Sequence, residues 1–356
     1  MNQSAKQPAD ILYQAGLAKS ASSGENIPQS FWYVKMLLGF SGWLAAFLLL
    51  CFLAPAFDFF IENKPALLIT GGLMICSAFG LLRVSGNDFY QHLALALSLA
   101  GQALVIFLIF DSVPDRGVLA WLGVFAFEAI LAAVIPDFVH RVFCSFVGAV
   151  AFARMLTYLG CPHIAGGVLI LAASFFWLNE FSCLLRIKTI QAIGYGLVLA
   201  LILFETITLL GYNGSWSPLT SSSPVFQTAP WMGEVLIAAA ALYVVLHLLN
   251  RHKQPMPGAV SISAFLGTLV VCLVSVKVQG LTVGMVILLL GFAGANRVLM
   301  GLGIVSLLFY ISSYYYLLET TLLAKSLTLL VVGLVLLCLR WLMLHMLPAP
   351  KEARHV

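Results

Sequence analysis

Five ionisable side chains lie inside long apolar segments of this sequence: Glu128, Arg154, Glu205, Glu234 and Lys325. Placing such a group at the centre of a membrane helix costs about 2.5–3.5 kcal/mol on insertion scales. Ionisable groups are therefore retained there mainly where they bind a ligand, move a proton or form a buried ion pair. These five positions are the first candidates for chemistry.

The depth of these groups follows from the rise of about 1.5 Å per residue in a helix. Arg154 and Glu205 each lie six residues from the predicted outer end of their segments, about 9 Å deep. Glu128 lies about 16 Å deep, and the other two charges lie about 5 Å deep. Gln102 adds an uncharged polar group about 12 Å deep.

Two interpretations of these groups remain open. In the functional one, Arg154 pairs with Glu205 or Glu128 in a polar cavity that opens to the outside of the membrane. In the structural one, the pair is a salt bridge that locks helices together, while Glu234 and Lys325 reach the membrane interface with their flexible stems.

The amino-acid composition indicates that lipid, and not water, surrounds the apolar segments that carry these groups. Of the 356 residues, 62% are hydrophobic and 9% are charged, and the mean hydropathy is +1.02. Soluble domains are about 45–50% apolar and about 25% charged. Only helices and closed barrels span a bilayer. Unbroken apolar blocks such as 328–338 predict helices, because barrel strands alternate in polarity.

The apolar pattern predicts an all-α, polytopic membrane protein with about 12 transmembrane helices. The predicted spans are 36–57, 66–82, 92–110, 117–135, 142–160, 164–179, 189–211, 231–249, 258–276, 281–294, 298–317 and 322–345. We expect three parts: a flexible cytoplasmic tail at 1–30, one membrane domain at 31–346 and a cytoplasmic tail at 347–356. The longest connection, 212–230, contains no charged residue.

The distribution of Lys and Arg predicts that both termini are cytoplasmic. With 12 spans, thirteen of these 18 residues lie inside and three lie outside, while Arg154 and Lys325 fall within spans. The short segment 281–294 is the weakest span. If it turned back as a re-entrant loop, Arg297 and the later basic residues would move outside and the bias would be lost.

Several functions lack support in the sequence. There is no basic run for nucleic acid, no metal-ligand spacing and no phosphate-binding loop. No cofactor is therefore expected, and an enzyme is disfavoured. The seven cysteines fit packing positions in the lipid phase. His140, near a span end, is interpreted as a hydrated structural residue, and the glycines at 284, 291, 294, 301 and 303 mainly as packing residues.

Some local motifs carry a family resemblance. Phe31-Trp32-Tyr33 precedes a first span that contains 39–44, and Leu99-Ala100-Gly101-Gln102 lies in the third span. The most specific element is the stretch 314–326, from Tyr314 to Ser326, which is followed by Gly333 and Leu339-Arg340-Trp341. These features resemble the bacterial inner-membrane family called domain of unknown function four-four-zero-one. The resemblance covers the chain beyond the N-terminal tail.

The resemblance implies a multi-pass protein of the bacterial inner membrane that is often encoded beside a membrane protein with a GDYXXLXY domain. It supplies no catalytic residue, but it gives weight to Gln102 and Lys325, which lie in matching segments. One hypothesis is a transporter-like protein with an outward-facing polar cavity. The alternative is a non-catalytic subunit of a membrane complex with a GDYXXLXY-type partner. A lipid-linked glycan enzyme is disfavoured, because the loop 212–230 carries no acid, base or histidine.

Overall fold

The computed structural model describes most of the apolar part of the chain. The described residues are 63–84, 88–113, 117–182, 186–211, 230–251, 258–275, 278 and 280–317, with isolated positions between 37 and 51 and between 323 and 341. The predicted spans 36–57 and 322–345 are represented only by such isolated positions, and Lys325 lies outside the described residues.

The described chain is helical and contains no strand. Its α-helices are α4 (Lys64–Val84), α5 (Asp88–Ser112), α6 (Val118–Val134), α7 (Phe138–Tyr158), α8 (Pro162–Leu178), α9 (Ile187–Gly211), α10 (Pro230–Arg251), α11 (Ala259–Ser275), α12 (Leu281–Ala293) and α13 (Arg297–Leu317). A short 3-10 helix, η2 (Glu180–Ser182), follows α8. Each α-helix coincides with one predicted span to within four residues, so the all-α prediction is confirmed.

Six of the described helices are long and apolar enough to cross a membrane, namely α4, α5, α7, α9, α10 and α13. The helices α6, α8, α11 and α12 are also apolar but have only 13 to 17 residues. These lengths and compositions fit a multi-pass membrane protein.

The chain forms two compact units. Residues 1–59 and 74–100 form one unit, in which Met74, Ala78 and Leu95 are buried. Residues 60–73 and 101–356 form the other unit. The larger unit holds α6 to α13 and every polar group discussed below.

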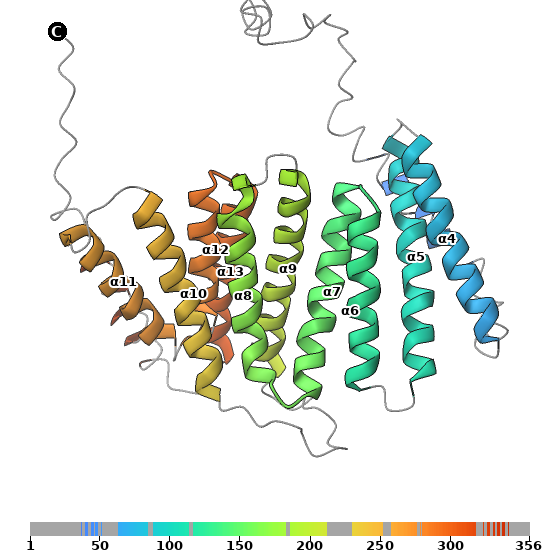
Figure 1. Cartoon of the computed structure of the whole chain (residues 1–356). Helices are drawn as coiled ribbons and strands as arrows, with labels where there is room; N and C mark the ends of the chain where they lie inside the picture. Colours follow the sequence, from blue (N-terminus) through green and yellow to red (C-terminus); the bar gives the residue numbers. More distant parts are fainter. Residues whose placement is uncertain are drawn as a thin grey trace, which may run out of the picture. The chain divides into compact units, whose positions relative to one another are not determined.

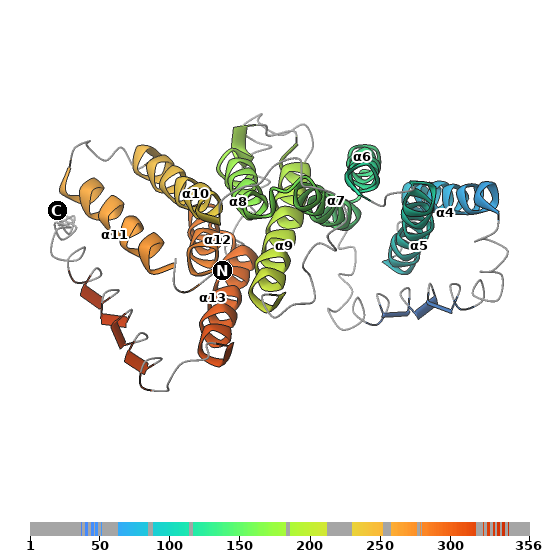
Figure 2. The same cartoon turned by 90° about the horizontal axis from the view of Figure 1, so that it is seen from below.

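In the larger unit, α6 to α10 stand side by side with α12 and α13 (Figures 1 and 2). Helix α7 packs on α6, α8 and α9, and α8 also packs on α10. Helix α12 packs mainly on α13 and also on α10. The shared core is apolar and includes Leu169, Leu201, Val244, Ile287 and Leu299.

Local sequence signals set the ends of α7 and α8. The Asp137 carboxylate accepts a hydrogen bond from the His140 amide at 2.8 Å and so caps the N-terminus of α7. This cap explains why α7 begins four residues before the apolar run that predicted it. After α7, Gly160 adopts the left-handed conformation with φ 87°. Pro162 is the first residue of α8. Proline is favoured there because the N–H that it lacks would have no partner within the helix.

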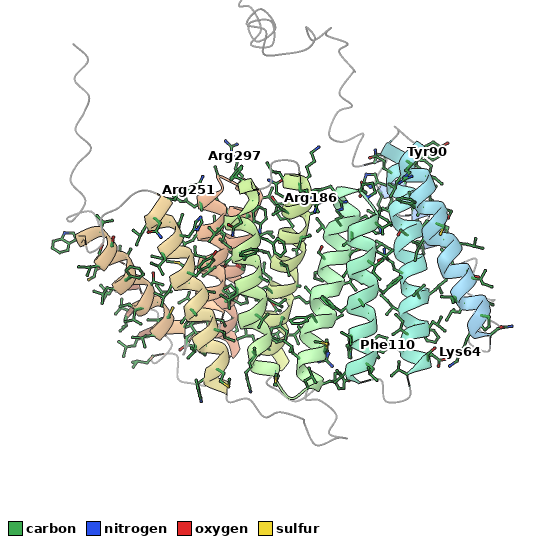
Figure 3. The ribbon with its side chains drawn as sticks, viewed as in Figure 1. Lys64, Tyr90, Phe110, Arg186, Arg251 and Arg297 are labelled. Carbon is green, nitrogen blue, oxygen red and sulfur yellow. The ribbon has the colours of Figure 1, made fainter. Side chains whose placement is uncertain are left out.

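Basic residues mark one end of the larger unit. Arg186, Arg251 and Arg297 lie at one end, which we call the arginine end, and Lys64 and Phe110 lie at the opposite end (Figure 3). Arg251 donates a hydrogen bond to the carbonyl of Ala293, the last residue of α12, at 3.3 Å. Helix α12 therefore ends beside the end of α10. Arg297, which begins α13, therefore lies at the same end as Arg251.

Candidate functional site

Four polar side chains meet in the interior of the larger unit. Gln102 of α5, Glu128 of α6, and His140 and Cys144 of α7 are 2%, 0%, 0% and 1% exposed, respectively. We call this group the buried polar cluster. Its burial removes all four groups from contact with both water and lipid tails.

A chain of polar contacts links three members of the cluster. The Gln102 amide nitrogen lies 2.9 Å from Nε2 of His140. Since an amide nitrogen can only donate, His140 Nε2 accepts, and the ring carries its proton on Nδ1. Nδ1 faces the Cys144 sulfur at 3.4 Å. The imidazole is therefore neutral and points its proton toward the thiol.

The geometry of α7 explains why these groups meet. His140, Cys144 and Gly148 follow one another at intervals of four residues, so they lie along one face of the helix. Asp137 fixes the first turn, which holds His140 in position. At Gly148, an added Cβ would lie 3.5 Å from the Cβ of Glu128. This is an ordinary van der Waals distance, so it shows that the stem of Glu128 lies directly against this face of α7.

Glu128 is the unusual member of the cluster. Both of its carboxyl oxygens are buried, and neither has a hydrogen-bond partner of ordinary geometry among the described residues. The Cys144 thiol is the polar side chain that acts on it. An ionised carboxylate without a partner is very costly in an apolar interior. This packing therefore suits the neutral acid, which holds one exchangeable proton.

The position of Glu128 along α6 gives its distance from each end of that helix. Glu128 lies six residues before the end of α6, about 9 Å from the arginine end of that helix, and ten residues, about 15 Å, from its start. The cluster therefore lies closer to the arginine end than to the end predicted to face outward.

The structure does not place Arg154 in this cluster. Its guanidinium lies over the rings of Trp121, at 5.7 Å, and Tyr158, at 5.6 Å. A hydrogen-bonded pair with Glu128 is excluded, because the Glu128 oxygens have no such partner. Arg154 thus lies among aromatic side chains near the far end of α7, where a cation over a ring is stabilised.

Glu205 and Glu234 form a separate polar region. Glu205 is only 5% exposed, and the charged side chain that acts on it is Glu234 of α10. One Glu205 carboxyl oxygen lies 2.5 Å from the position that a Cβ would take at Gly166 of α8. Glycine at 166 is therefore required for Glu205 to occupy its place. The acid that lies near Glu205 is Glu234.

A third polar region lies at the arginine end, outside the spanning helices. Glu180 of η2 is buried, and burial raises the pKa of its carboxyl above the usual value, although Gln191 and Arg251 oppose this shift. Nearby, the Tyr195 hydroxyl donates to the Asn296 side-chain oxygen at 2.9 Å. These contacts join the turns at the arginine end to α9.

His140 and Cys144 are the site residues that the sequence analysis missed. His140 was interpreted as a hydrated residue, and this was wrong, because it is fully buried. The signal was present in the spacing Asp137, His140, Cys144 and Gly148, which places a cap, two polar groups and a small residue along one helix face. Among the described residues, no group of three or more His, Cys, Asp or Glu could hold a metal ion.

Comparison with known families gives one result. Residues 31–346 match the family described as Domain of unknown function (DUF4401). The chain belongs to this family. No curated protein and no solved structure matches the chain. The resemblance drawn from the motifs at 31–44 and 314–341 is thus confirmed, and the family name supplies no activity.

Proposed function

We propose that this DUF4401 protein is a transporter-like protein of the bacterial inner membrane, and that Glu128 binds and releases a proton during its cycle. In this proposal the chain has about 12 spans, both termini are cytoplasmic and the arginine end faces the cytoplasm. The proposal favours a role without enzymatic activity and involves no cofactor.

The observation that supports this function is the state of the Glu128 carboxyl. Nearly all buried polar side chains in proteins find a partner, so an exception calls for an explanation. A structural role would place Glu128 in a salt bridge or in strong hydrogen bonds, whereas its carboxyl oxygens have no partner of ordinary geometry among the described residues and its polar neighbour is the Cys144 thiol. A carboxyl that exchanges a proton accounts for its burial as the neutral acid.

The neighbours of Glu128 outline a path for that proton. Cys144 lies between Glu128 and His140, and His140 belongs to the first turn of α7 at the arginine end. Asp137 and Arg141 are the charged groups next to His140. A proton on Glu128 would therefore exchange with the arginine end through His140, which has both a donor and an acceptor nitrogen.

A reconstitution experiment tests this function. The purified chain is placed in liposomes that contain a pH-sensitive dye, and a potassium gradient with valinomycin makes the interior negative. We expect faster acidification than in protein-free liposomes, and we expect Glu128→Gln to abolish the difference. Glu180→Gln, outside the spanning helices, is the control and should retain the wild-type rate. Wild-type flux in Glu128→Gln would refute the assignment.

Infrared spectroscopy provides a second readout. A buried neutral carboxyl has a C=O stretching band that is separate from the bands of ionised carboxylates. The part of this band that arises from Glu128 should vanish in Glu128→Gln and remain in Glu180→Gln. If Glu128→Gln leaves the band of protonated acids unchanged, Glu128 is ionised and the proposal is wrong.

The alternative function is a non-catalytic subunit that assembles with a GDYXXLXY-type membrane protein. It is supported by the family membership and by the resemblance that names this neighbour. Purification in mild detergent, with mass spectrometry of wild type and Lys325→Ala, separates the two proposals. A stoichiometric partner that is lost in the variant would favour the subunit, and an active chain without partners would favour the transporter-like protein.

A further inference from the structure

A large apolar groove lies next to the buried polar cluster. It has a volume of about 840 Å³ and runs between α6, α7, α8 and α9. Small residues form much of its wall, including Ala129, Ala132, Ala133, Gly148, Ala149 and Ala172. Binding pockets for small molecules have volumes of about 300–1,000 Å³, so this space is large enough for a ligand.

The polar groups of the groove gather at one end. Arg141, Arg186 and Thr189 line the groove at the arginine end. Arg141 is half-buried: its Nε donates to the carbonyl of Ala132 at 3.0 Å, and a terminal nitrogen donates to the Thr189 hydroxyl at 2.7 Å. These bonds hold the guanidinium in place. A guanidinium has five N–H groups, so an Arg141 fixed in this way retains donors for a further acceptor.

The charges at this end are not balanced within the groove. The described residues that line it include two arginines and no Asp or Glu. Arg186 is exposed, so its guanidinium can reach a group at the mouth. Two cations beside an apolar space complement a molecule that has an anionic head and an apolar tail.

The length of the groove matches one membrane leaflet. Along α7 its lining runs from Arg141 to Phe152, and along α9 from Arg186 to Leu197. Each run rises eleven residues, about 16 Å. The hydrocarbon core of a bilayer is about 30 Å thick, so one leaflet contributes about 15 Å. Phe125 and Phe152, whose ring centroids lie 5.5 Å apart, close the deep end of the groove.

We propose that the groove between α6, α7, α8 and α9 binds one anionic phospholipid of the leaflet at the arginine end. The phosphate lies against Arg141 and Arg186, and one acyl chain follows the small residues toward Phe125 and Phe152. A basic pocket between transmembrane helices is a known way to hold anionic lipid head groups. This proposal does not depend on transport, because a lipid can occupy the groove in any conformational state that keeps it open.

The test is native mass spectrometry of the full chain in detergent, with phosphatidylglycerol or phosphatidylethanolamine added in increasing amounts. We expect one phosphatidylglycerol to bind, with an affinity at least about fivefold higher than that of phosphatidylethanolamine. Arg186→Gln should lower the phosphatidylglycerol affinity about fivefold, because each basic residue near the surface contributes modestly to binding of anionic lipid.

Two further variants separate the groove from other surfaces. Ala172→Phe fills the groove and should prevent binding of either lipid. Arg251→Gln removes a cation from the same end of the molecule but outside the groove lining, and should bind phosphatidylglycerol as the wild type does. Circular dichroism and thermal unfolding of each variant show that it is folded.

Several outcomes would overturn the proposal. Equal affinity for phosphatidylglycerol and phosphatidylethanolamine would show that the arginines do not select an anionic head group. Unchanged binding in both Arg186→Gln and Ala172→Phe would place the lipid elsewhere. Binding of laurate in preference to phosphatidylglycerol would identify a single-chain anion as the occupant instead of a phospholipid.

Discussion

The contact between α12 and α13 and the groove between α6 and α9 are both rich in small residues, yet they are built in opposite ways. We call the first contact the α12–α13 seam, and at three of its glycines an added Cβ would come too close to the other helix. At Gly284 it would lie 2.8 Å from the Leu307 side chain. At Gly291 it would lie 2.5 Å from the Met300 nitrogen, and at Gly303 it would lie 2.7 Å from the Leu288 nitrogen. In the groove, alanines border about 840 Å³ of open space.

This difference shows that small residues in membrane helices have two uses. In the seam they let two backbones approach closely. Lipid tails are as apolar as the helix surface, so helices in a membrane associate mainly through such close packing. In the groove they keep a space open. Small size is common to both sets of residues, so the distance to the facing atoms is what distinguishes the two uses.

The largest expected effect is at the seam. Gly303→Ala should destabilise the protein by about 1–3 kcal/mol, because the new methyl group meets the backbone of α12, which can move only if the helices separate. Thermal unfolding in detergent measures the loss. Gly301→Ala is the matched control, since no atom lies within 4 Å of its Cβ position. Equal losses in the two variants would show that the seam is not closely packed.

The groove predicts a similar contrast within α8. Ala173 is 1% exposed in the apolar core, whereas Ala172 borders the groove. Ala173→Leu should cost about 1–3 kcal/mol through overpacking. Ala172→Leu extends into open space and should change the free energy of unfolding by less than about 1 kcal/mol. If Ala172→Leu proves as damaging as Ala173→Leu, the groove is not an open space.

The helices that border the groove and the seam also begin differently. Helix α7 has a side-chain cap at Asp137, whereas α12 begins at Gly280 without one. Asp137→Ala should therefore destabilise the protein by about 1 kcal/mol, and Asp137→Asn, which can still accept the bond, should cost less. Chemical denaturation in mixed micelles compares the three proteins. Identical curves for Ala and Asn would mean that the cap contributes nothing.

The smallest effect concerns pH at the turn that follows the seam. Glu180 has a carboxyl oxygen 3.4 Å from the Cβ position of Gly294, and burial raises the pKa of this carboxyl above 4.5. The folded protein then binds more protons than the unfolded one, so its free energy of unfolding falls as the pH rises from about 4.5 through the folded-state pKa.

Glu180→Gln removes this dependence. The unfolding temperature of the variant should rise relative to that of the wild type by up to a few degrees as the pH increases from about 4.5 to 7. Below about 4.5, where the carboxyl is protonated in both states, the relative difference should stay constant. A fall in the unfolding temperature of the variant relative to that of the wild type over this pH range would contradict the assigned direction.

The helices were predictable because apolar runs and turn residues are local signals. The positions of Arg154 and Glu205 along their helices were also predictable, since residue counts give distance along a helix axis. The rotation of each helix was not. Arg154 faces Trp121, whereas Glu205 faces Gly166, and apolar residues surround both in the sequence. The faces of the five helices α5 to α9 that form the buried polar cluster and the groove come together only through packing.

The early interpretation of His140 failed for a related reason. A position near a helix end suggested contact with water, but the face of α7 that carries His140 is buried against its neighbours, while Phe138 and Val139 on other faces are exposed. Gln102, in contrast, was selected from the resemblance and lies in the buried polar cluster, 2.9 Å from His140. Nothing in either segment shows that these two residues face each other.

The short helices have a consequence for the membrane itself. Helix α6 has 17 residues, about 25 Å, and exposes Leu119, Leu122 and Ile130 along its length. The hydrocarbon core of a bilayer is about 30 Å thick, which is more than the length of α6. If α6 crosses the membrane, the bilayer beside it must become thinner to match the helix. The larger unit is therefore expected to thin the bilayer locally and to favour membranes with shorter acyl chains.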